Sequence, residues 1–300
     1  MELGLDGLGV SRVGLGCNNF GGRIDGEATR AVVLAALDAG VTFFDTADTY
    51  GGQGGSERLL GEILEGRRGE VVLATKFGKD MGDGATSRGS AAYVRRALDA
   101  TLERLRTDHV DLYYQHEPDP SIPVAETLGT LDELVRAGKV RAVGCSNFSA
   151  EQLAEADRAA RENGTVRFVA LQNHYNLLER GDDADVLPLA RELGVAYVPY
   201  FPLASGLLTG KVRRGERGPD GSRLAGREFD DASFDRLEAL ECFAAGHGRT
   251  LLELAISALA STPGIASVIA GATKPAQVRA NAAAAGWQLT LGELEELASI

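Results

Sequence analysis

Short apolar runs alternate with longer amphipathic runs along almost the whole chain, and this alternation limits the fold more than any other feature. Most of the short runs are apolar at nearly every position, which is typical of parallel strands buried on both faces. Eight such units, each a strand followed by a helix, predict a closed parallel barrel. The candidate strands cover residues 13–16, 41–45, 71–76, 110–115, 140–145, 166–172, 196–200 and 267–270.

Helix signals fall between these runs. Asp25 is expected to cap the first helix, and Ser149 with Gln152 forms a capping-box pattern. The candidate helices cover residues 26–39, 56–64, 91–105, 123–137, 150–161, 186–193, 234–245, 251–259 and 275–285. Residues 3–10 show a strand–turn–strand pattern, so we expect a hairpin that plugs the N-terminal end of the barrel. The sequence therefore predicts one domain over residues 1–300, a (β/α)8 TIM barrel with an N-terminal β-hairpin and extra helices near the C-terminus.

Composition restricts the partners. The 300 residues include 31 basic and 43 acidic side chains, giving a net charge of −12. This balance disfavours nucleic acid and anionic membranes, because phosphate contacts need clustered Lys and Arg. No apolar run approaches the roughly 18 residues that a membrane span requires, and no secretory signal is evident at the N-terminus. We therefore expect a small-molecule substrate and a monomer or weak homo-oligomer.

Three cysteines, at positions 17, 145 and 242, are too far apart in sequence to form a metal-ligand pair, and their number is odd. This usage predicts a reduced, cytoplasmic protein without a metal site.

Polar residues close three successive candidate strands. Asp45, Lys76 and His116 end these runs, and Tyr50 follows Asp45 in a Gly-rich loop. Because polar residues at the C-terminal ends of barrel strands form active sites, we expect these four side chains to meet in one pocket. A barrel lysine such as Lys76 also suits a Schiff-base aldolase, and this alternative stays open.

Several motifs occur in order along the chain, at residues 43–51, 74–76, 111–116, 138–148, 171–173, 202–211 and 268–273. In these motifs the chain resembles the aldo-keto reductase superfamily, in the manner of a bacterial-type member, along nearly its whole length. The resemblance implies a TIM barrel, a nicotinamide cofactor held without a Rossmann domain, and reversible conversion of a carbonyl into an alcohol. In agreement, the Gly-x-Gly-x-x-Gly dinucleotide pattern is missing from the sequence.

Carbonyl reduction needs a hydride on carbon and a proton on oxygen. Tyr50 is our candidate proton donor, and we expect Lys76 to lower the pKa of its phenol, which is about 10 when free. Asp45 would keep Lys76 charged, and His116 would hydrogen-bond the substrate oxygen. A third possibility is a cofactor-sensing regulatory subunit, as in the potassium-channel β subunits that resemble this family.

The resemblance also implies cofactor contacts. The residues expected at the nicotinamide are Ser146, Asn147 and Gln172, which bind the carboxamide, and Tyr200, which stacks on the ring. Those expected around the pyrophosphate are Leu203, Ser205, Gly206, Leu208 and Lys211. Those expected at the adenosine end are Gly271, Thr273, Lys274, Gln277 and Asn281. A cation at Lys274 favours NADP over NAD, because it suits a 2′-phosphate.

The segment 211–231 is long and carries five arginines, so it is expected to act either as a lid over the cofactor or as a solvated surface loop. Glu117, directly after His116, indicates a polar substrate or simply a solvent-facing loop.

Overall fold

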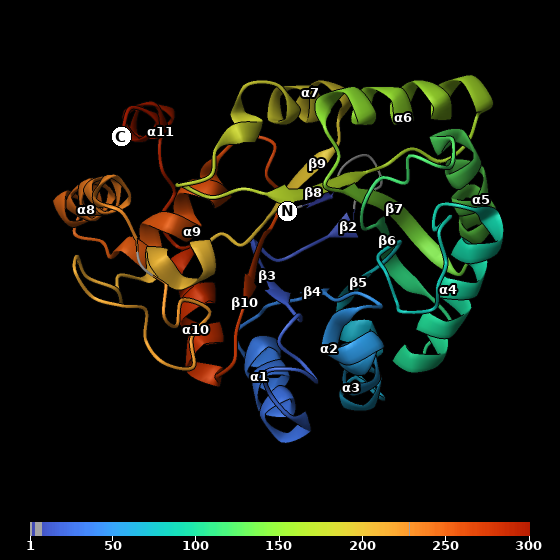
Figure 1. Cartoon of the computed structure of the whole chain (residues 1–300), viewed down its shortest axis with the longest axis horizontal. Coiled ribbons are helices and arrows are strands. Elements are labelled where there is room, and N and C mark those ends of the chain that lie inside the picture. The colour runs from blue at the N-terminus through green and yellow to red at the C-terminus, as the bar shows by residue number, and fades with distance from the viewer. Residues whose placement is uncertain (1, 4–7, 228) are drawn as a thin grey trace.

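A computed structural model describes residues 2–3, 8–227 and 229–300 of the chain. Eight parallel strands close into a barrel, and β10 completes the ring by pairing with β3 (Figure 1). The strands are β3 (Val13–Gly16), β4 (Phe43–Asp45), β5 (Val72–Phe77), β6 (Val110–Gln115), β7 (Val140–Ser146), β8 (Ala170–His174), β9 (Ala196–Tyr200) and β10 (Val268–Gly271). The predicted barrel is confirmed, and each strand matches a predicted run.

Helices surround the strands in the order that the sequence pattern indicates. They are α1 (Gly26–Asp38), α2 (Tyr50–Gln53), α3 (Gly55–Ile63), α4 (Ala91–Leu105), α5 (Val124–Arg136), α6 (Ala150–Asn163), α7 (Val186–Leu193), α8 (Asp231–Gly246), α9 (Leu251–Ser261), α10 (Pro275–Ala284) and α11 (Leu291–Ala298). The Asp25 cap is confirmed by its bond from the Ala28 amide, and the Ser149–Gln152 capping box is present. No helix in the described part of the chain combines the length and apolar character needed to cross a membrane.

The hairpin plugs the N-terminal end of the barrel as expected. Strand β1 (Glu2–Leu3) pairs antiparallel with β2 (Leu8–Gly9); the turn at residues 4–7 lies outside the described residues. Leu8 and Val10 are buried in the same apolar cluster as Val169 and Ala196, which stand where β8 and β9 begin. The candidate functional end is therefore the opposite one, where the strands finish.

Several element boundaries differ from the sequence-based prediction, and two helices, α2 and α11, were not predicted. Strand β8 begins at Ala170 rather than at residue 166, because the Val166 amide donates to the Asp132 side chain instead of to a neighbouring strand. Strand β4 begins at Phe43 rather than at residue 41. Helix α11 was not predicted, although Thr290 and Glu293 form a capping box that would have indicated it.

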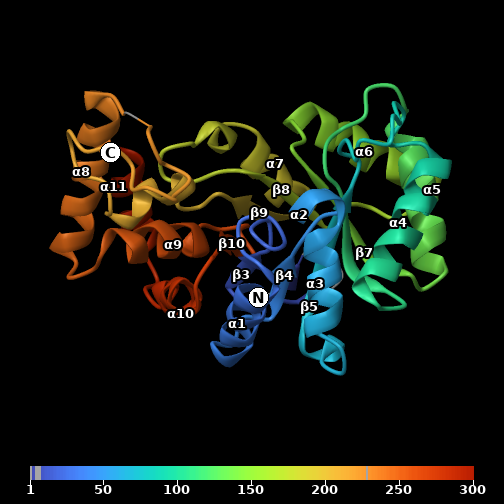
Figure 2. The same cartoon turned by 60° about the horizontal axis from the view of Figure 1, so that its bottom comes forward.

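The extra helices build a second apolar cluster outside the barrel. Figure 2 shows α8 and α11 together at one side of the molecule, beyond α9. Phe234 and Leu240 of α8, Leu254 of α9 and Leu297 of α11 are buried in this cluster. It also contains Leu207 and Leu208, so it supports the segment that follows β9.

Candidate active site

A buried ion pair lies at the C-terminal end of the barrel. Asp45 ends β4, and its Oδ2 accepts a hydrogen bond from Lys76 Nζ at 2.7 Å. Lys76 is 0% exposed and also donates to the backbone oxygen of Thr46 at 2.8 Å. The other Asp45 oxygen accepts from Gln172 Nε2 at 2.9 Å. Asp45 and Lys76 therefore meet as predicted, and Gln172 holds the carboxylate that pairs with Lys76.

Tyr50 stands over this pair, at the start of the short helix α2. Lys76 Nζ lies 5.1 Å from the centroid of the Tyr50 ring. The chain turns sharply after Tyr50, since Gly51 has a φ of 71° and a Cβ there would be 2.4 Å from the Phe20 backbone oxygen. Only glycine fits this position, so the Gly-rich sequence fixes where the phenol points.

His116 completes the predicted group of four. Its ring meets the Tyr50 ring edge to face, with centroids 5.9 Å apart and planes at 81°. Its backbone amide donates to the Phe77 oxygen at 2.8 Å, which places the residue just past the end of β6. Its Nδ1 is buried without a hydrogen-bond partner among the described residues.

The charges of these groups follow from burial and proximity. Burial by itself would lower the pKa of Lys76, but Asp45 and Tyr50 outweigh it and the pKa is raised, so the ammonium stays charged. Burial, together with the charges of Lys76 and Lys79, lowers the pKa of His116 to about 2, and the imidazole is neutral. Burial raises the pKa of Tyr50 by more than Lys76 lowers it. Lys76 therefore lowers the Tyr50 pKa as expected, but the net pKa is above its ordinary value because desolvation outweighs the neighbouring cation.

Asn147 and Tyr200 form a second layer above the ion pair. Asn147 adopts a φ of 61° and donates to the His116 backbone oxygen at 2.9 Å. The Tyr200 hydroxyl donates to Asn147 Oδ1 at 2.8 Å, and its ring stacks on His174 with centroids 5.4 Å apart. The hydrogen bond holds the Tyr200 hydroxyl, and the stacking covers one face of the ring. Tyr200 also lines the cavity.

These side chains face a cavity of about 870 Å³. This volume lies within the roughly 300–1,000 Å³ typical of sites for small molecules and cofactors. The predicted residues that line it are Asp45, Tyr50, His116, Ser146, Asn147, Gln172, Tyr200, Leu203, Ser205, Gly206, Lys211, Gly271, Thr273, Lys274, Gln277 and Asn281. Lys76 lies beneath it, fully buried.

Leu208 does not fit its predicted role. Its side chain is 0% exposed and belongs to the apolar cluster of α8 and α9, and its amide donates to the Leu203 oxygen. Neither its side chain nor its amide is available to a ligand in the cavity. Leu208 instead packs in the apolar cluster outside the barrel. The sequence pattern does not define that cluster.

The start of α10 lies at the far end of the cavity. The side-chain oxygen of Gln277 accepts from the backbone amides of Thr273 at 2.8 Å and Lys274 at 3.2 Å. Gln277 therefore caps these amides, while the Lys274 side chain is left exposed at the cavity edge.

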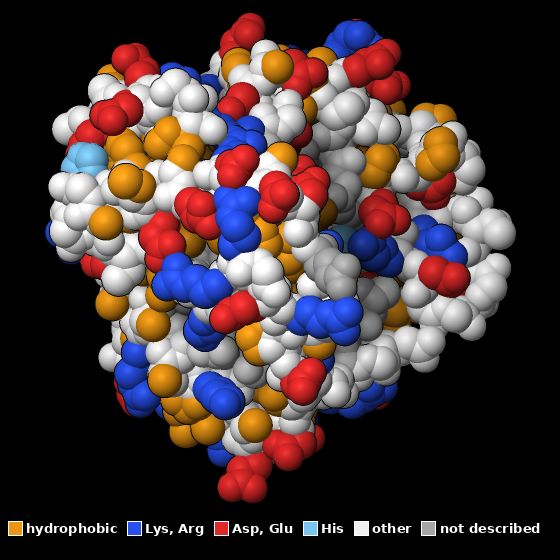
Figure 3. Space-filling model, turned by 60° about the vertical axis from the view of Figure 1, so that its left-hand side comes forward, with side chains coloured by type: hydrophobic (Ala, Val, Ile, Leu, Met, Phe, Trp, Pro, Cys, Tyr) orange, Lys and Arg blue, Asp and Glu red, His pale blue; other side chains and the backbone are white. Residues whose placement is uncertain are grey.

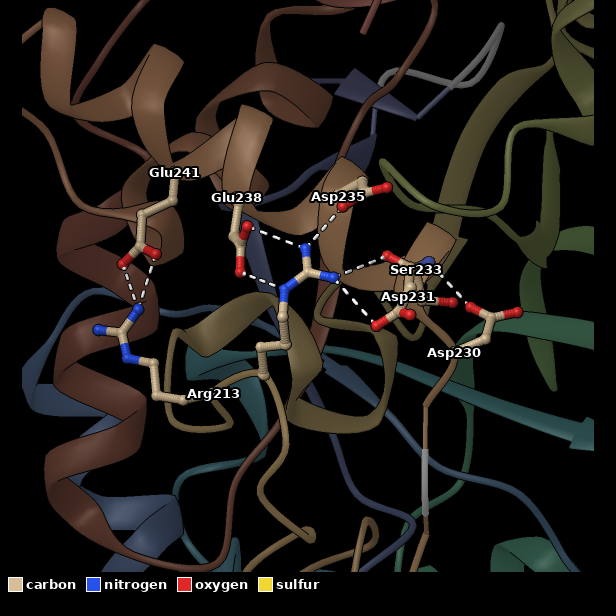
Figure 4. A network of polar contacts seen from close by, with 8 residues as sticks. Arg213, Asp230, Asp231, Ser233, Asp235, Glu238 and Glu241 are labelled. Atoms are coloured by element: carbon tan, nitrogen blue, oxygen red, sulfur yellow. Dashed lines mark hydrogen bonds and ion pairs between the residues drawn. The ribbon is translucent and has the colours of Figure 1, made fainter.

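The segment 211–231 lies against the cavity, but its arginines differ in what they contact. Figure 4 shows Arg213 against Glu241, whereas Glu238, Asp235 and Asp231 lie around the neighbouring arginine. Arg214 forms ion pairs with Asp231, Asp235 and Glu238 of α8. The start of the segment 211–231 is therefore bound to the helix that follows the segment. The lysine and arginine side chains over this side of the molecule alternate with acidic ones rather than forming a single patch (Figure 3).

Two further arginines line the cavity. Arg223 belongs to the segment expected to act as a lid, whereas Arg23 was not assigned to the site by sequence reasoning. Arg223 donates to the side-chain oxygens of Asn18 at 2.8 Å and Asn19 at 2.9 Å, and Arg23 donates to the Gly221 backbone oxygen at 2.6 Å. The sequence signal for Arg223 was its place in the arginine-rich segment 211–231 of an acidic chain. The sequence around Arg23 gave no comparable signal.

The aldo/keto reductase family profile matches residues 12–300 of the chain. The chain belongs to the aldo/keto reductase family. Aldo-keto reductase YhdN of Bacillus subtilis (strain 168) is 34% identical, over 98% of this chain and 91% of that protein. A probable aldo-keto reductase 1 of Glycine max is 33% identical, over 99% and 87%. A probable voltage-gated potassium channel subunit beta of Oryza sativa subsp. japonica is 35% identical, over 93% and 89%. As a member of this aldo/keto reductase family, the chain is an NAD(P)H-dependent oxidoreductase.

Proposed function

We propose that this aldo/keto reductase interconverts an aldehyde or ketone and the corresponding alcohol with NADP(H), and that Tyr50 is the general acid and base. The observation that carries the proposal is the grouping at the C-terminal end of the barrel. A protonated phenol, a charged ammonium and a neutral imidazole lie together beside a cavity large enough for a dinucleotide. We place the enzyme in the cytoplasm, in keeping with its three scattered cysteines.

Each side chain has a task that follows from its charge. Tyr50 gives its proton to the carbonyl oxygen during reduction and takes one from the alcohol during oxidation. Because burial makes a phenolate costly, the adjacent charged Lys76 is what stabilises it when the proton leaves. Asp45 and Gln172 keep that lysine in place. His116 is neutral at any ordinary pH, so it can donate a hydrogen bond to the substrate oxygen without transferring its proton to that oxygen.

The cavity suits an anionic cofactor. Five lysines and arginines line it. Lys79 pairs with Glu117, and the other four have no carboxylate partner in the described part of the chain; they are Arg23, Lys211, Arg223 and Lys274. Unpaired cations at one site in a chain of net charge −12 indicate a ligand that carries several negative charges. We propose that Lys211 and the arginines hold the pyrophosphate and that Lys274 holds a 2′-phosphate. The bound nicotinamide supplies the hydride.

The Schiff-base alternative does not fit the geometry. A nucleophilic lysine must be neutral and must reach the substrate. Lys76 is fully buried, hydrogen-bonded to Asp45 and Thr46, and held in its charged form. The regulatory-subunit alternative has weak support in the name of the rice relative. A pull-down from the native host tests it, with a specific membrane-channel partner as the result that would favour it.

The test is the substitution Tyr50→Phe. It keeps the ring but removes the proton donor, so we expect carbonyl reduction to fall by about 10²–10⁴, with NADPH binding and thermal stability unchanged. The matched control is Tyr175→Phe. Tyr175 is buried and does not line the cavity, and its hydroxyl donates to Asp183 at 2.5 Å, so loss of this hydroxyl should leave turnover intact.

A screen over aldehydes, ketoses, ketosteroids and α-dicarbonyls supplies the substrate for these assays. Near-normal turnover by the Tyr50→Phe enzyme with cofactor bound would reject the assigned mechanism. Failure of the wild-type enzyme to oxidise NADPH with any of these carbonyls would reject the proposed reaction.

A further inference from the structure

A second polar cluster lies outside the barrel, between β5, α3 and α4, and no part of the proposed mechanism uses it. Glu57 of α3 is 0% exposed. Its Oε1 accepts from the Thr75 hydroxyl at 2.5 Å and from the Thr101 hydroxyl at 3.2 Å, and its Oε2 accepts from Arg104 Nε at 2.6 Å. Glu57 is thus supplied with donors on both oxygens, as an ionised carboxylate requires.

Asp48 lies beside Glu57 in the opposite situation. It is 2% exposed, and neither of its carboxyl oxygens has a hydrogen-bond partner among the described residues. If both carboxyls were ionised, two negative charges would be buried against the single positive charge of Arg104, because Lys76 is already paired with Asp45. One proton removes the excess, and it belongs on Asp48, since Glu57 holds all the donors.

The position of Asp48 connects this cluster to catalysis. Its amide donates to the Lys76 backbone oxygen at 3.2 Å, and it precedes the proposed proton donor Tyr50 by two residues. The start of the loop is tied down separately, because Thr46 accepts from Lys76 Nζ and its hydroxyl meets Ser56 Oγ at 2.8 Å. Beyond Tyr50 the chain runs through Gly51 and Gly52, which both have positive φ. The Asp48 amide is therefore the last backbone link to β5 before the phenol.

We propose that Asp48 is a positioning residue for Tyr50: its buried carboxyl must stay protonated to keep the loop docked on β5, and loss of that proton displaces Tyr50 from the catalytic site. An ionised Asp48 would be a buried charge with only the adjacent Thr49 amide to stabilise it, next to the like charge of Glu57. Such a group moves toward solvent, and its amide leaves the Lys76 oxygen as it moves.

The charges around Asp48 agree with this assignment. Burial, followed by the charge of Glu57, raises the pKa of the Asp48 carboxyl to about 7, while Arg104, the nearby Thr49 amide and Lys76 lower it by less. The phenols of Tyr93 and Tyr113 also face it; burial is the main cause of their raised pKa values, and Asp48 adds to it. Both phenols are therefore neutral over the range in which Asp48 titrates.

The proposed catalytic groups do not titrate in that range. The pKa of His116 is about 2, and those of Tyr50 and Lys76 are raised above their already alkaline ordinary values. Turnover at saturating NADPH and carbonyl should therefore be flat between pH 6 and 9 unless another group controls it. Saturation also removes effects of pH on cofactor binding. A one-proton loss of turnover centred near pH 7 points to Asp48.

The experiment compares the wild-type enzyme with Asp48→Asn, which is neutral at every pH, and it rests on the proposed function for its kinetic part. We expect wild-type kcat to fall as pH rises through about 7, and the Asp48→Asn enzyme to show no such fall. At pH 8 the variant should exceed the wild type by about tenfold, since one group with a pKa near 7 is then about nine-tenths ionised. The control Asp132→Asn changes a buried carboxyl on α5, far from the cavity lining, and should keep the wild-type profile.

Amide hydrogen exchange of residues 46–53, corrected for intrinsic rates, gives a readout independent of activity. The wild type should lose protection there between pH 6 and 8.5, and Asp48→Asn should not. Equal protection at both pH values in the wild type, or a wild-type kinetic profile in a folded Asp48→Asn enzyme, would overturn the proposal. Absence of any carbonyl reduction by the wild type would instead reject the proposed function, and the exchange measurement would then decide the role of Asp48 alone.

Discussion

Strands β5 and β6 have buried charged residues near both of their ends, and the two ends satisfy those charges differently. Near the N-terminal end of β6, Asp111 is 2% exposed and accepts from the Leu73 amide at 2.9 Å, Arg68 at 2.6 Å and Arg141 at 2.7 Å. At the C-terminal end, Lys76 is paired, but the His116 Nδ1 and both Asp48 oxygens have no partner among the described residues. The polar groups of the first end stabilise the barrel, and those of the second are left available for ligands and protons.

The two buried aspartates show the same contrast in their pKa values. Burial raises the pKa of Asp111, but the Leu73 amide and the two arginines together lower the pKa by more than burial raises it. The net pKa of Asp111 is therefore below its ordinary value. Asp48 has no comparable donors, and its pKa is raised to about 7. For these two buried aspartates, the supply of hydrogen-bond donors decides the direction of the pKa shift.

The largest effect should come from breaking the ion pair at the C-terminal end. Lys76→Met leaves Asp45 buried without its cation and Tyr50 without the charge that stabilises its phenolate. We expect turnover to fall by at least about 10² and the free energy of unfolding to drop by about 3–5 kcal/mol. Steady-state kinetics and urea unfolding measure the two losses.

The control for this change is Lys139→Met, which removes an exposed pair with Asp99. It should cost under about 1 kcal/mol and leave turnover unchanged. Retention of full activity by Lys76→Met would contradict the assigned role of the ammonium.

The second prediction separates stability from activity at the N-terminal end. Asp111→Asn should lower the free energy of unfolding by about 1–3 kcal/mol through its lost charged hydrogen bonds, with kcat and KM unchanged. Because the folded-state pKa of Asp111 is lowered, its contribution is present above the unfolded value of about 3.9 and is lost as pH falls through the folded value.

Asp48 should act with the opposite sign. Its folded pKa is raised, so its contribution is full below about pH 4 and is lost as pH rises to about 7. Urea unfolding between pH 3 and 8 isolates each contribution as the difference between the wild type and the variant, because the lowered pKa of His116 and the raised pKa of Glu57 also shape the wild-type curve. The difference for Asp48→Asn should change between pH 4 and 7, and the difference for Asp111→Asn below about pH 4. A difference between the wild type and Asp48→Asn that is constant between pH 4 and 7 would count against the raised pKa of Asp48.

The smallest effect is expected at the rim of the cavity. Lys274 is exposed and has no ion pair in the described part of the chain, so its removal should affect neither stability nor kcat. We expect Lys274→Ala to weaken NADPH binding by about tenfold, the worth of one charge-assisted hydrogen bond, and to leave NADH binding unchanged. Fluorescence titration measures both affinities. Arg279→Ala, on the exposed surface of the same helix, is the control. Equal wild-type affinities for NADPH and NADH would remove the argument for a 2′-phosphate.

The sequence by itself determined the barrel and the position of its functional end. Strand runs, helix caps such as Asp25 and the order of the units are local patterns, and local patterns are readable along a chain. Parallel strands bring their carboxyl ends to one edge, so Asp45, Lys76 and His116 could be placed together from sequence position alone. Their catalytic roles, and those of the predicted cofactor contacts, stay predictions.

Only the tertiary structure decided how those groups are charged and which others join them. The raised pKa of Tyr50 and the burial of Leu208 depend on how much protein surrounds each side chain. The bond from Gln172 to Asp45 joins residues that are 127 positions apart, and Asp48 meets Glu57 only because α3 packs there. Sequence patterns record neighbours along the chain, whereas desolvation and Coulomb interactions depend on neighbours in space.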